Sequence, residues 1–140
     1  MKLFVIDTNI YLDYVMKGSN CFSKLVNHFF KLLEKNECVL YVPTICFWEI
    51  ARKIITRKLG MTKKSPEEAL WFIQKPLEDQ RSFKDLPLNR KAALLAPHFR
   101  EKLQDPFDQL IVASALEANL PLITKDLNIQ KSKLIQTVWD

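Results

Sequence analysis

The chain has 140 residues, 48% of them hydrophobic, and its 21 basic and 16 acidic side chains give a formal net charge of +5. This size and apolar content predict one globular domain with a single substantial core and exclude a disordered polypeptide. Three cysteines form no C-x-x-C pair, and neither a signal peptide nor an apolar span of 18 residues is present. We therefore expect a cytoplasmic protein whose modest basic excess favours a polyanionic partner.

Short apolar runs rich in β-branched and aromatic residues alternate along the chain with longer segments of helical spacing. Strands are expected at residues 2–6, 39–42, 82–88, 120–124 and 134–139. Pro87 confines the third to a sheet edge or marks the end of this strand. Helices are expected at residues 10–16, 22–35, 43–59, 65–75, 90–96 and 105–118, with Gly18, Gly60, Pro76 and Asn119 as stop signals. Residues 1–140 are therefore predicted to form one α/β domain, a three-layer α/β/α sandwich on a mostly parallel sheet of about five strands.

The predicted helix at residues 43–59 contains an unexpected charge. Its apolar residues, Trp48 among them, are expected to face the core, yet Glu49 stands inside the run CFWEIA, where charged residues are rare. An ion pair with Arg52 or Lys53, three and four residues further on, is the simpler explanation of Glu49 taken alone. A catalytic role is the alternative.

An acidic start and an acidic end enclose an almost wholly apolar middle in the stretch DPFDQLIVASALEANLPLITKD. Asp105 suits the N-cap of a helix, Pro106 its first position and Asp108 its third, so a buried helix is expected to follow. Asn119 ends this helix, and the next short strand ends at Asp126. One carboxylate therefore opens a helix and another closes the strand after it.

Four acids occupy equivalent places in the predicted topology. Asp7 ends the first strand, Asp126 ends the fourth, Asp108 opens a helix, and Glu49 lies in the first turns of a helix that follows a strand. Strand C-terminal ends and helix N-terminal ends share one edge of an open parallel sheet, so the four carboxylates can meet there. Such a cluster needs a compensating cation, and oxygen ligands favour Mg²⁺ or Mn²⁺ over zinc. A hard metal ion that activates water beside a phosphodiester indicates a hydrolytic nuclease.

The distribution of basic residues is a second indication of a polyanionic substrate. Residues 52–64 carry six basic side chains and no acid, which indicates either a phosphate-binding patch or a solvated helix face. The chain has only two glycines, and it has no G-x-x-x-x-G-K-[ST] loop and no G-x-S-x-G elbow. A metal-free ribonuclease that uses His28 and His98 is an alternative, although neither histidine has a recognisable partner.

Four segments, FVIDTNI, TICFWEIARK, DPFDQLIVASAL and LPLITKD, resemble in sequence and order the motifs of PIN-domain nucleases, and most of all the VapC toxins of bacterial toxin–antitoxin pairs. The resemblance spans nearly the whole chain, including the terminal run LIQTVW. It implies a Mg²⁺- or Mn²⁺-dependent endoribonuclease, often a homodimer, held inactive by a small antitoxin whose tail enters the acidic groove. Asp7, Glu49, Asp108 and Asp126 would then be the acidic quartet and metal ligands.

The resemblance also suggests roles for neighbouring residues. Asp105 would be an additional acid of the D-P-F-D motif and a further metal ligand, although an N-cap explains it fully. Gln109 departs from the pattern, because toxin-like members with this motif often have arginine there, and a phosphate contact would be lost. The candidate polar helpers are Thr8, Asn9 and Thr124. The residues expected to bind the RNA backbone, or alternatively the antitoxin, are Arg52, Lys53, Arg57 and Lys58.

Two other hypotheses about function are compatible with this sequence. One is a PIN nuclease of RNA maturation that works outside toxin–antitoxin systems. The other is a module that binds metal or RNA and does not cleave.

Overall fold

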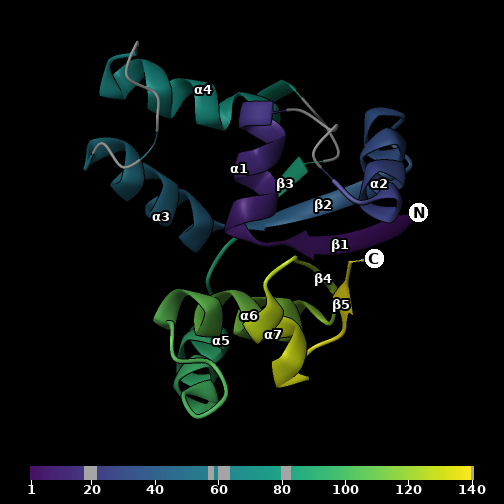
Figure 1. Ribbon diagram of the computed structural model, residues 1–140, viewed down its shortest axis with the longest axis vertical. Coiled ribbons are helices and arrows are strands. Elements are labelled where there is room, and N and C mark those ends of the chain that lie inside the picture. Colours follow the sequence, from purple (N-terminus) through teal and green to yellow (C-terminus); the bar gives the residue numbers. More distant parts are fainter. Residues whose placement is uncertain (18–21, 57–58, 60–63, 80–82, 140) are drawn as a thin grey trace.

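The computed structural model describes residues 1–17, 22–56, 59, 64–79 and 83–139, and arranges them around one sheet (Figure 1). The strands in the described residues are β1 (Lys2–Ile6), β2 (Cys38–Pro43), β3 (Phe83–Leu86), β4 (Leu122–Ile123) and β5 (Thr137–Val138). The helices are α1 (Thr8–Lys17), α2 (Lys24–Glu34), α3 (Thr44–Ile55), α4 (Pro66–Asp79), α5 (Arg90–Leu95), the 3₁₀ helix η2 (Ala96–Phe99), α6 (Pro106–Ala118) and α7 (Leu127–Ser132). All strand pairs are parallel, in the order β3-β2-β1-β4-β5.

The central strand β1 is flanked by β2 on one side and by β4 on the other. The chain first runs outward from β1 to β2 and β3, and then returns across β1 to β4 and β5. Because parallel crossovers are right-handed, this reversal places α1 to α4 on one face of the sheet and α5 to α7 on the opposite face, as Figure 1 shows. The predicted three-layer α/β/α fold with a five-stranded sheet is confirmed. The reversal also creates a topological switch point between β1 and β4, the place where open parallel sheets bind ligands.

The core forms where the central strands are covered by helices on both faces. Val5 and Ile6 of β1 and Leu40 of β2 are fully buried, as the continuous apolar runs predicted. On α6 the buried residues include Ile111 and Val112, so this helix lies almost entirely inside the protein. The acids that precede and follow these apolar segments are thereby held at the edge of a rigid core.

The predicted end of the fourth helix at Pro76 is wrong, because α4 continues through Pro76 to Asp79. Proline cannot donate a backbone hydrogen bond, and its ring crowds the preceding turn. In that turn Ile73 is buried, and its carbonyl accepts a hydrogen bond from the buried Tyr11 hydroxyl of α1. Packing of α4 against α1 therefore outweighs the local cost of Pro76.

Other boundaries also differ from the expected ones. Helix α7 directly after β4 was not predicted, and most of η2 lies between the expected helices at residues 90–96 and 105–118, where no element was predicted. Helix α1 begins at Thr8, two residues early, because Asp7 caps it. Trp48 was expected in the core but is 52% exposed. The expected stops at Gly18 and Gly60 lie outside the described residues. No helix in the described part of the chain has the length and apolar character needed to cross a membrane.

Candidate active site

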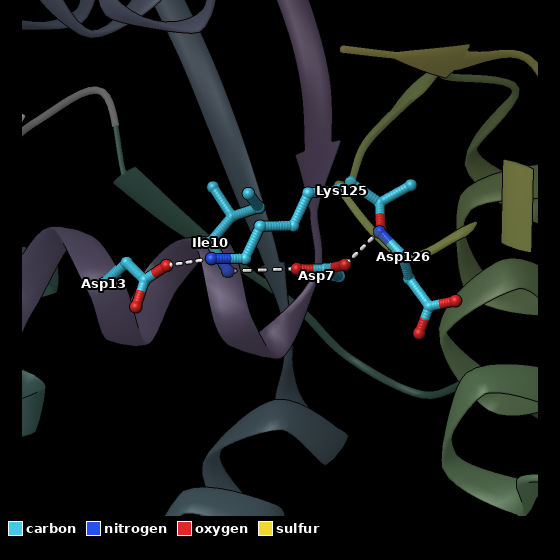
Figure 2. A network of polar contacts seen from close by, with 6 residues as sticks. Asp7, Ile10, Asp13, Lys125 and Asp126 are labelled. Atoms are coloured by element: carbon cyan, nitrogen blue, oxygen red, sulfur yellow. Dashed lines mark hydrogen bonds and ion pairs between the residues drawn. The ribbon is translucent and has the colours of Figure 1, made fainter. Parts of the chain in front are cut away.

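The carboxylate of Asp7 is fixed at the C-terminal end of the central strand β1. Its Oδ1 accepts a hydrogen bond of 3.0 Å from the backbone N–H of Ile10 in α1. Its Oδ2 accepts a hydrogen bond from the Thr124 hydroxyl, and Figure 2 shows the carboxylate between α1 and the segment that leads to Asp126. Asp7 is 5% exposed, and this burial raises the pKa of its carboxyl to about 6, although both hydrogen bonds lower it. Asp7 is therefore a rigid, buried acid at the switch point of the sheet.

Thr124 connects Asp7 to Asp126. It is fully buried after β4, and its Oγ1 donates to Asp7 and accepts a hydrogen bond of 3.1 Å from the Asp126 backbone N–H. Asp126 caps α7, because its Oδ1 accepts hydrogen bonds of 2.8 Å and 3.1 Å from the N–H groups of Asn128 and Ile129. Thr124 therefore holds two acids in a fixed relation, as a supporting residue would.

Glu49, in the second turn of α3, is bound to the start of α1. Its Oε1 accepts a hydrogen bond of 2.7 Å from the Thr8 hydroxyl. Glu49 forms no ion pair with any residue that the structure describes, so pairing with Arg52 or Lys53 does not account for it. Burial raises the pKa of the Glu49 carboxyl, whereas the Thr8 hydrogen bond lowers it. The first turn of α1 thus holds two acids: Asp7 through the Ile10 N–H and Glu49 through the Thr8 hydroxyl.

Asp108, in the first turn of α6, interacts electrostatically with the other three acids. It is half-buried, and burial raises the pKa of its carboxyl to about 7. The carboxylates that raise this pKa further are, in decreasing order, those of Asp105, Asp126, Glu49 and Asp7. The acid cluster, which we define as Asp7, Glu49, Asp108 and Asp126, therefore comes from four separate segments and lies close enough for its members to repel one another.

Cys46 is a residue of this site that the sequence did not reveal. It is fully buried on α3, and burial raises the pKa of its thiol well above the usual range. A hydrogen bond with Thr8 lowers this pKa, and the charges of Asp7, Glu49 and Asp108 raise it. The thiol is therefore a neutral, apolar neighbour of the acid cluster. Its position three residues before Glu49, on the same helix face, was the only available signal.

A hard divalent cation fits the chemistry of the acid cluster. The available donors are carboxylate and hydroxyl oxygens, which Mg²⁺ and Mn²⁺ prefer. Burial first and neighbouring carboxylates second raise the pKa values of Asp7 and Asp108, and a bound cation would favour the ionised form of both. Within the described residues no three Asp, Glu, His or Cys side chains are already gathered as a complete ligand set. Mg²⁺ usually takes one or two carboxylates and keeps several waters, so a complete set of protein ligands is not required.

Asp105, Gln109 and Asn9 differ in how they relate to the acid cluster. Asp105 is exposed and caps α6 through a hydrogen bond of 2.8 Å from the Phe107 N–H, yet its charge still raises the pKa of two cluster acids. Gln109 is buried, and its Nε2 donates a hydrogen bond of 2.6 Å to the Leu103 carbonyl, so it faces the core and not a phosphate. Asn9 is exposed in the first turn of α1, and its supporting role stays a prediction.

The structure describes two of the four side chains predicted to bind RNA. Arg52 is exposed on α3, with its guanidinium carbon 5.7 Å from the centre of the Trp48 ring. Lys53 is half-buried on the same helix and lowers the pKa of a cluster acid. Arg57 and Lys58 lie outside the described residues. Two of the four predicted cations therefore border the acid cluster.

The two histidines lie on elements that carry none of the cluster acids. His28 is exposed on α2 beside Phe29, and His98 is exposed on η2. The hypothesis of a metal-free ribonuclease that uses both histidines gains no geometric support.

Several solved structures share this fold. VapBC2 from Rickettsia felis, bound to a DNA fragment from its promoter, aligns with a TM-score of 0.71 and 16% identity over 99% of each chain. DNA-bound VapBC from Salmonella typhimurium aligns with a TM-score of 0.68 and 19% identity over 99% of this chain and 98% of that one. VapBC-1 from nontypeable Haemophilus influenzae gives a TM-score of 0.69 and 20% identity over 97% of this chain and 96% of that one.

A comparison of the sequence with protein families agrees with this structural likeness. No curated protein matches the chain. The model of the PIN domain, however, matches residues 4–133, a span that includes all four members of the acid cluster. The chain belongs to the PIN-domain family.

Proposed function

We propose that this protein is a divalent-metal-dependent endoribonuclease that acts in the cytoplasm as the toxin of a toxin–antitoxin pair. One observation carries the proposal: hydrogen bonds through Thr124 and Thr8 hold Asp7, Asp126 and Glu49 at one end of the sheet, where burial and neighbouring carboxylates also raise the pKa values of Asp7 and Asp108. Keeping several acids together without a cation costs free energy, so proteins retain such clusters where they bind metal or act on protons. Mg²⁺ or Mn²⁺ is the cation that suits these oxygen donors.

Each residue has a definite task in this proposal. Asp7, Asp108, Asp126 and Glu49 would hold the divalent metal. Bound Mg²⁺ or Mn²⁺ would lower the pKa of a water molecule and neutralise charge on the phosphodiester in the transition state. Thr124 and Thr8 hold Asp7 and Glu49 in place through their hydroxyl groups. Arg52 and Lys53 attract the RNA backbone towards the acids, which would otherwise repel it.

The related structures support the proposed toxin role and an antitoxin partner. The structural relatives include VapBC proteins, and a Klebsiella pneumoniae relative is described as a toxin–antitoxin complex. A small antitoxin that covers the acid cluster would keep the nuclease inactive. We propose the same kind of partner for this chain, together with a homodimeric assembly.

The proposed activity is tested by cleavage of a mixed pool of structured RNAs after removal of any co-purified partner. We expect cutting with Mg²⁺ or Mn²⁺ and none with EDTA. Asp108→Asn should slow cleavage by roughly a hundredfold or more, because a metal-binding carboxylate is lost. Asp79→Asn makes the same chemical change on the exposed end of α4, where Asp79 pairs with Lys75 3.9 Å away, and should leave cleavage unchanged. Cleavage that continues in EDTA, or at an equal rate in both variants, would exclude the proposed mechanism.

A further inference from the structure

Trp48 forms an exposed aromatic surface beside the acid cluster. It is 52% exposed, although a tryptophan ring gains much free energy from burial. Its ring packs against that of Phe107, with a centroid distance of 5.1 Å and an interplanar angle of 33°. Trp48 directly precedes Glu49, and Phe107 directly precedes Asp108. The Trp48–Phe107 pair therefore joins the two helices, α3 and α6, that supply these acids.

A shallow hollow next to this aromatic pair combines three kinds of group. Its volume is about 90 Å³, and its lining residues are Trp48, Glu49, Arg52, Lys53, Thr56 and Phe107. The Arg52 guanidinium lies 5.7 Å from the centre of the Trp48 ring, within the range of a cation–π contact. Aromatic faces, two cations and one cluster acid thus meet at one place on the surface.

These groups match the chemistry of a nucleotide whose base is unpaired. Single-stranded nucleic acids are held by bases that stack on aromatic rings or guanidinium planes, while basic side chains contact the phosphates. A base inside a duplex is already stacked on both faces and cannot reach such a surface. Two neighbouring residues of α3 are suited to different tasks. Glu49 accepts a hydrogen bond from Thr8, whereas the Trp48 ring is exposed to solvent, where a base can stack on it.

We infer that Trp48 and Phe107 hold an unpaired RNA base next to the scissile phosphate. The position of this base beside a cleaved phosphate rests on the proposed nuclease function, but the binding itself does not require catalysis. Arg52 and Lys53 contact the neighbouring phosphates, and the flat ring of Trp48 carries the base. Trp48 is thereby a specificity-determining residue, and it selects unpaired RNA.

The chain contains a matched control in Trp71. This residue is 57% exposed on α4, and the Lys75 ammonium lies 5.2 Å from the centre of its ring. Trp71 therefore has the exposure and the cation–π contact of Trp48, but it lies on a helix that carries none of the cluster acids. A loss caused only by removal of an exposed indole would appear equally in both positions.

The test measures fluorescence anisotropy of a labelled mixed-sequence oligoribonucleotide, either alone or annealed to its complement, in EDTA so that metal-dependent cleavage does not occur. Wild type and Trp71→Ala should bind the single strand equally and prefer it to the duplex. Trp48→Ala should bind the single strand about tenfold more weakly or worse, the loss expected for one stacked base. Trp48→Phe keeps a flat ring and should recover most of the affinity. In cleavage assays Trp48→Ala should raise KM more than it lowers kcat.

Three results would overturn the inference. The first is equal single-strand binding by Trp48→Ala and Trp71→Ala, and the second is equal binding of single strand and duplex by wild type. The third is a wild-type dimer that Trp48→Ala converts to a monomer in size-exclusion chromatography, which would assign Trp48 to an interface between copies. If wild type binds single strands through Trp48 but cleaves no RNA with metal, only the proposed nuclease function fails.

Discussion

Replacing Asp7 with asparagine will abolish RNA cleavage and at the same time stabilise the metal-free protein at neutral pH. Asp7 is 5% exposed, and burial raises the pKa of its carboxyl from 3.8 to about 6. At pH 7.5 the folded protein therefore contains a buried charge that the unfolded chain exposes to water. A pKa difference of two units corresponds to about 3 kcal/mol of unfolding free energy, the upper limit of the gain. The asparagine side chain keeps an oxygen that can accept the hydrogen bond from the Ile10 N–H, so the start of α1 is preserved.

The measurement is denaturant unfolding of wild type and Asp7→Asn in EDTA between pH 4 and pH 8, combined with the cleavage assay. The direction of the pH effect follows from proton linkage. A carboxyl with a raised folded-state pKa binds protons more tightly when folded, so its contribution to the free energy of unfolding falls as pH rises through about 6. The two proteins should therefore differ most near pH 8 and least near pH 4. Asp7→Ala, which loses both acceptors, should be less stable than Asp7→Asn at every pH. An Asp7→Asn variant less stable than wild type at pH 8 would show that the charge is already compensated.

The metal-free wild type will lose stability as pH rises from about 4 to about 7, and a divalent cation will restore it. Both Asp7 and Asp108 have raised pKa values, about 6 and about 7, so both lose protons more readily in the unfolded chain over this range. A cation that binds only the folded protein adds about 2.7 kcal/mol at a free concentration one hundred times its Kd. Thermal or denaturant unfolding with Mn²⁺ and with EDTA at each pH measures both effects. A flat pH profile, or no response to Mn²⁺, would contradict the description of the acid cluster as uncompensated.

Most of the fold was predictable because its signals are local. Parallel strands are buried on both faces, so β1 and β2 appear in the sequence as continuous apolar runs. The start of α6 is marked by Asp105 and Pro106, and its end by Asn119, whose φ of 55° suits the residue after a helix. Helix α7 was missed because it spans only Leu127–Ser132 and is specified by the cap that Asp126 provides.

The errors arose where tertiary contacts decide the outcome. Pro76 reads as a stop, but Tyr11 and the packing of Ile73 keep α4 intact beyond it. Trp48 fits the helical spacing of its apolar neighbours, yet its ring lies against Phe107 outside the core. Helical spacing gives the angle of a side chain around the helix axis. It does not tell how far the neighbouring elements extend to cover that side chain.

The positions of the candidate site residues were predictable, but the connections between them were not. The rule that strand ends and helix starts share one sheet edge placed Asp7, Asp108 and Asp126 together from the sequence. The hydrogen bond from Thr124 to Asp7 joins residues 117 positions apart, and the bond from Thr8 to Glu49 spans 41. Such pairings depend on strand order and crossing geometry, which no single-sequence pattern encodes. The roles of these residues in catalysis stay predictions.

The most direct test of the acid cluster as a metal site is calorimetric titration of the partner-free, metal-free protein with Mn²⁺ at pH 6 and pH 7.5. Saturable binding should be tighter at pH 7.5, because carboxyls with pKa values of about 6 and about 7 must lose protons to bind the ion. Asp7→Asn and Asp108→Asn should each weaken binding by roughly tenfold or more, and Asp79→Asn should not change it. Equal Mn²⁺ affinity in wild type and both cluster variants would contradict the assignment of the metal site and of the nuclease mechanism that depends on it.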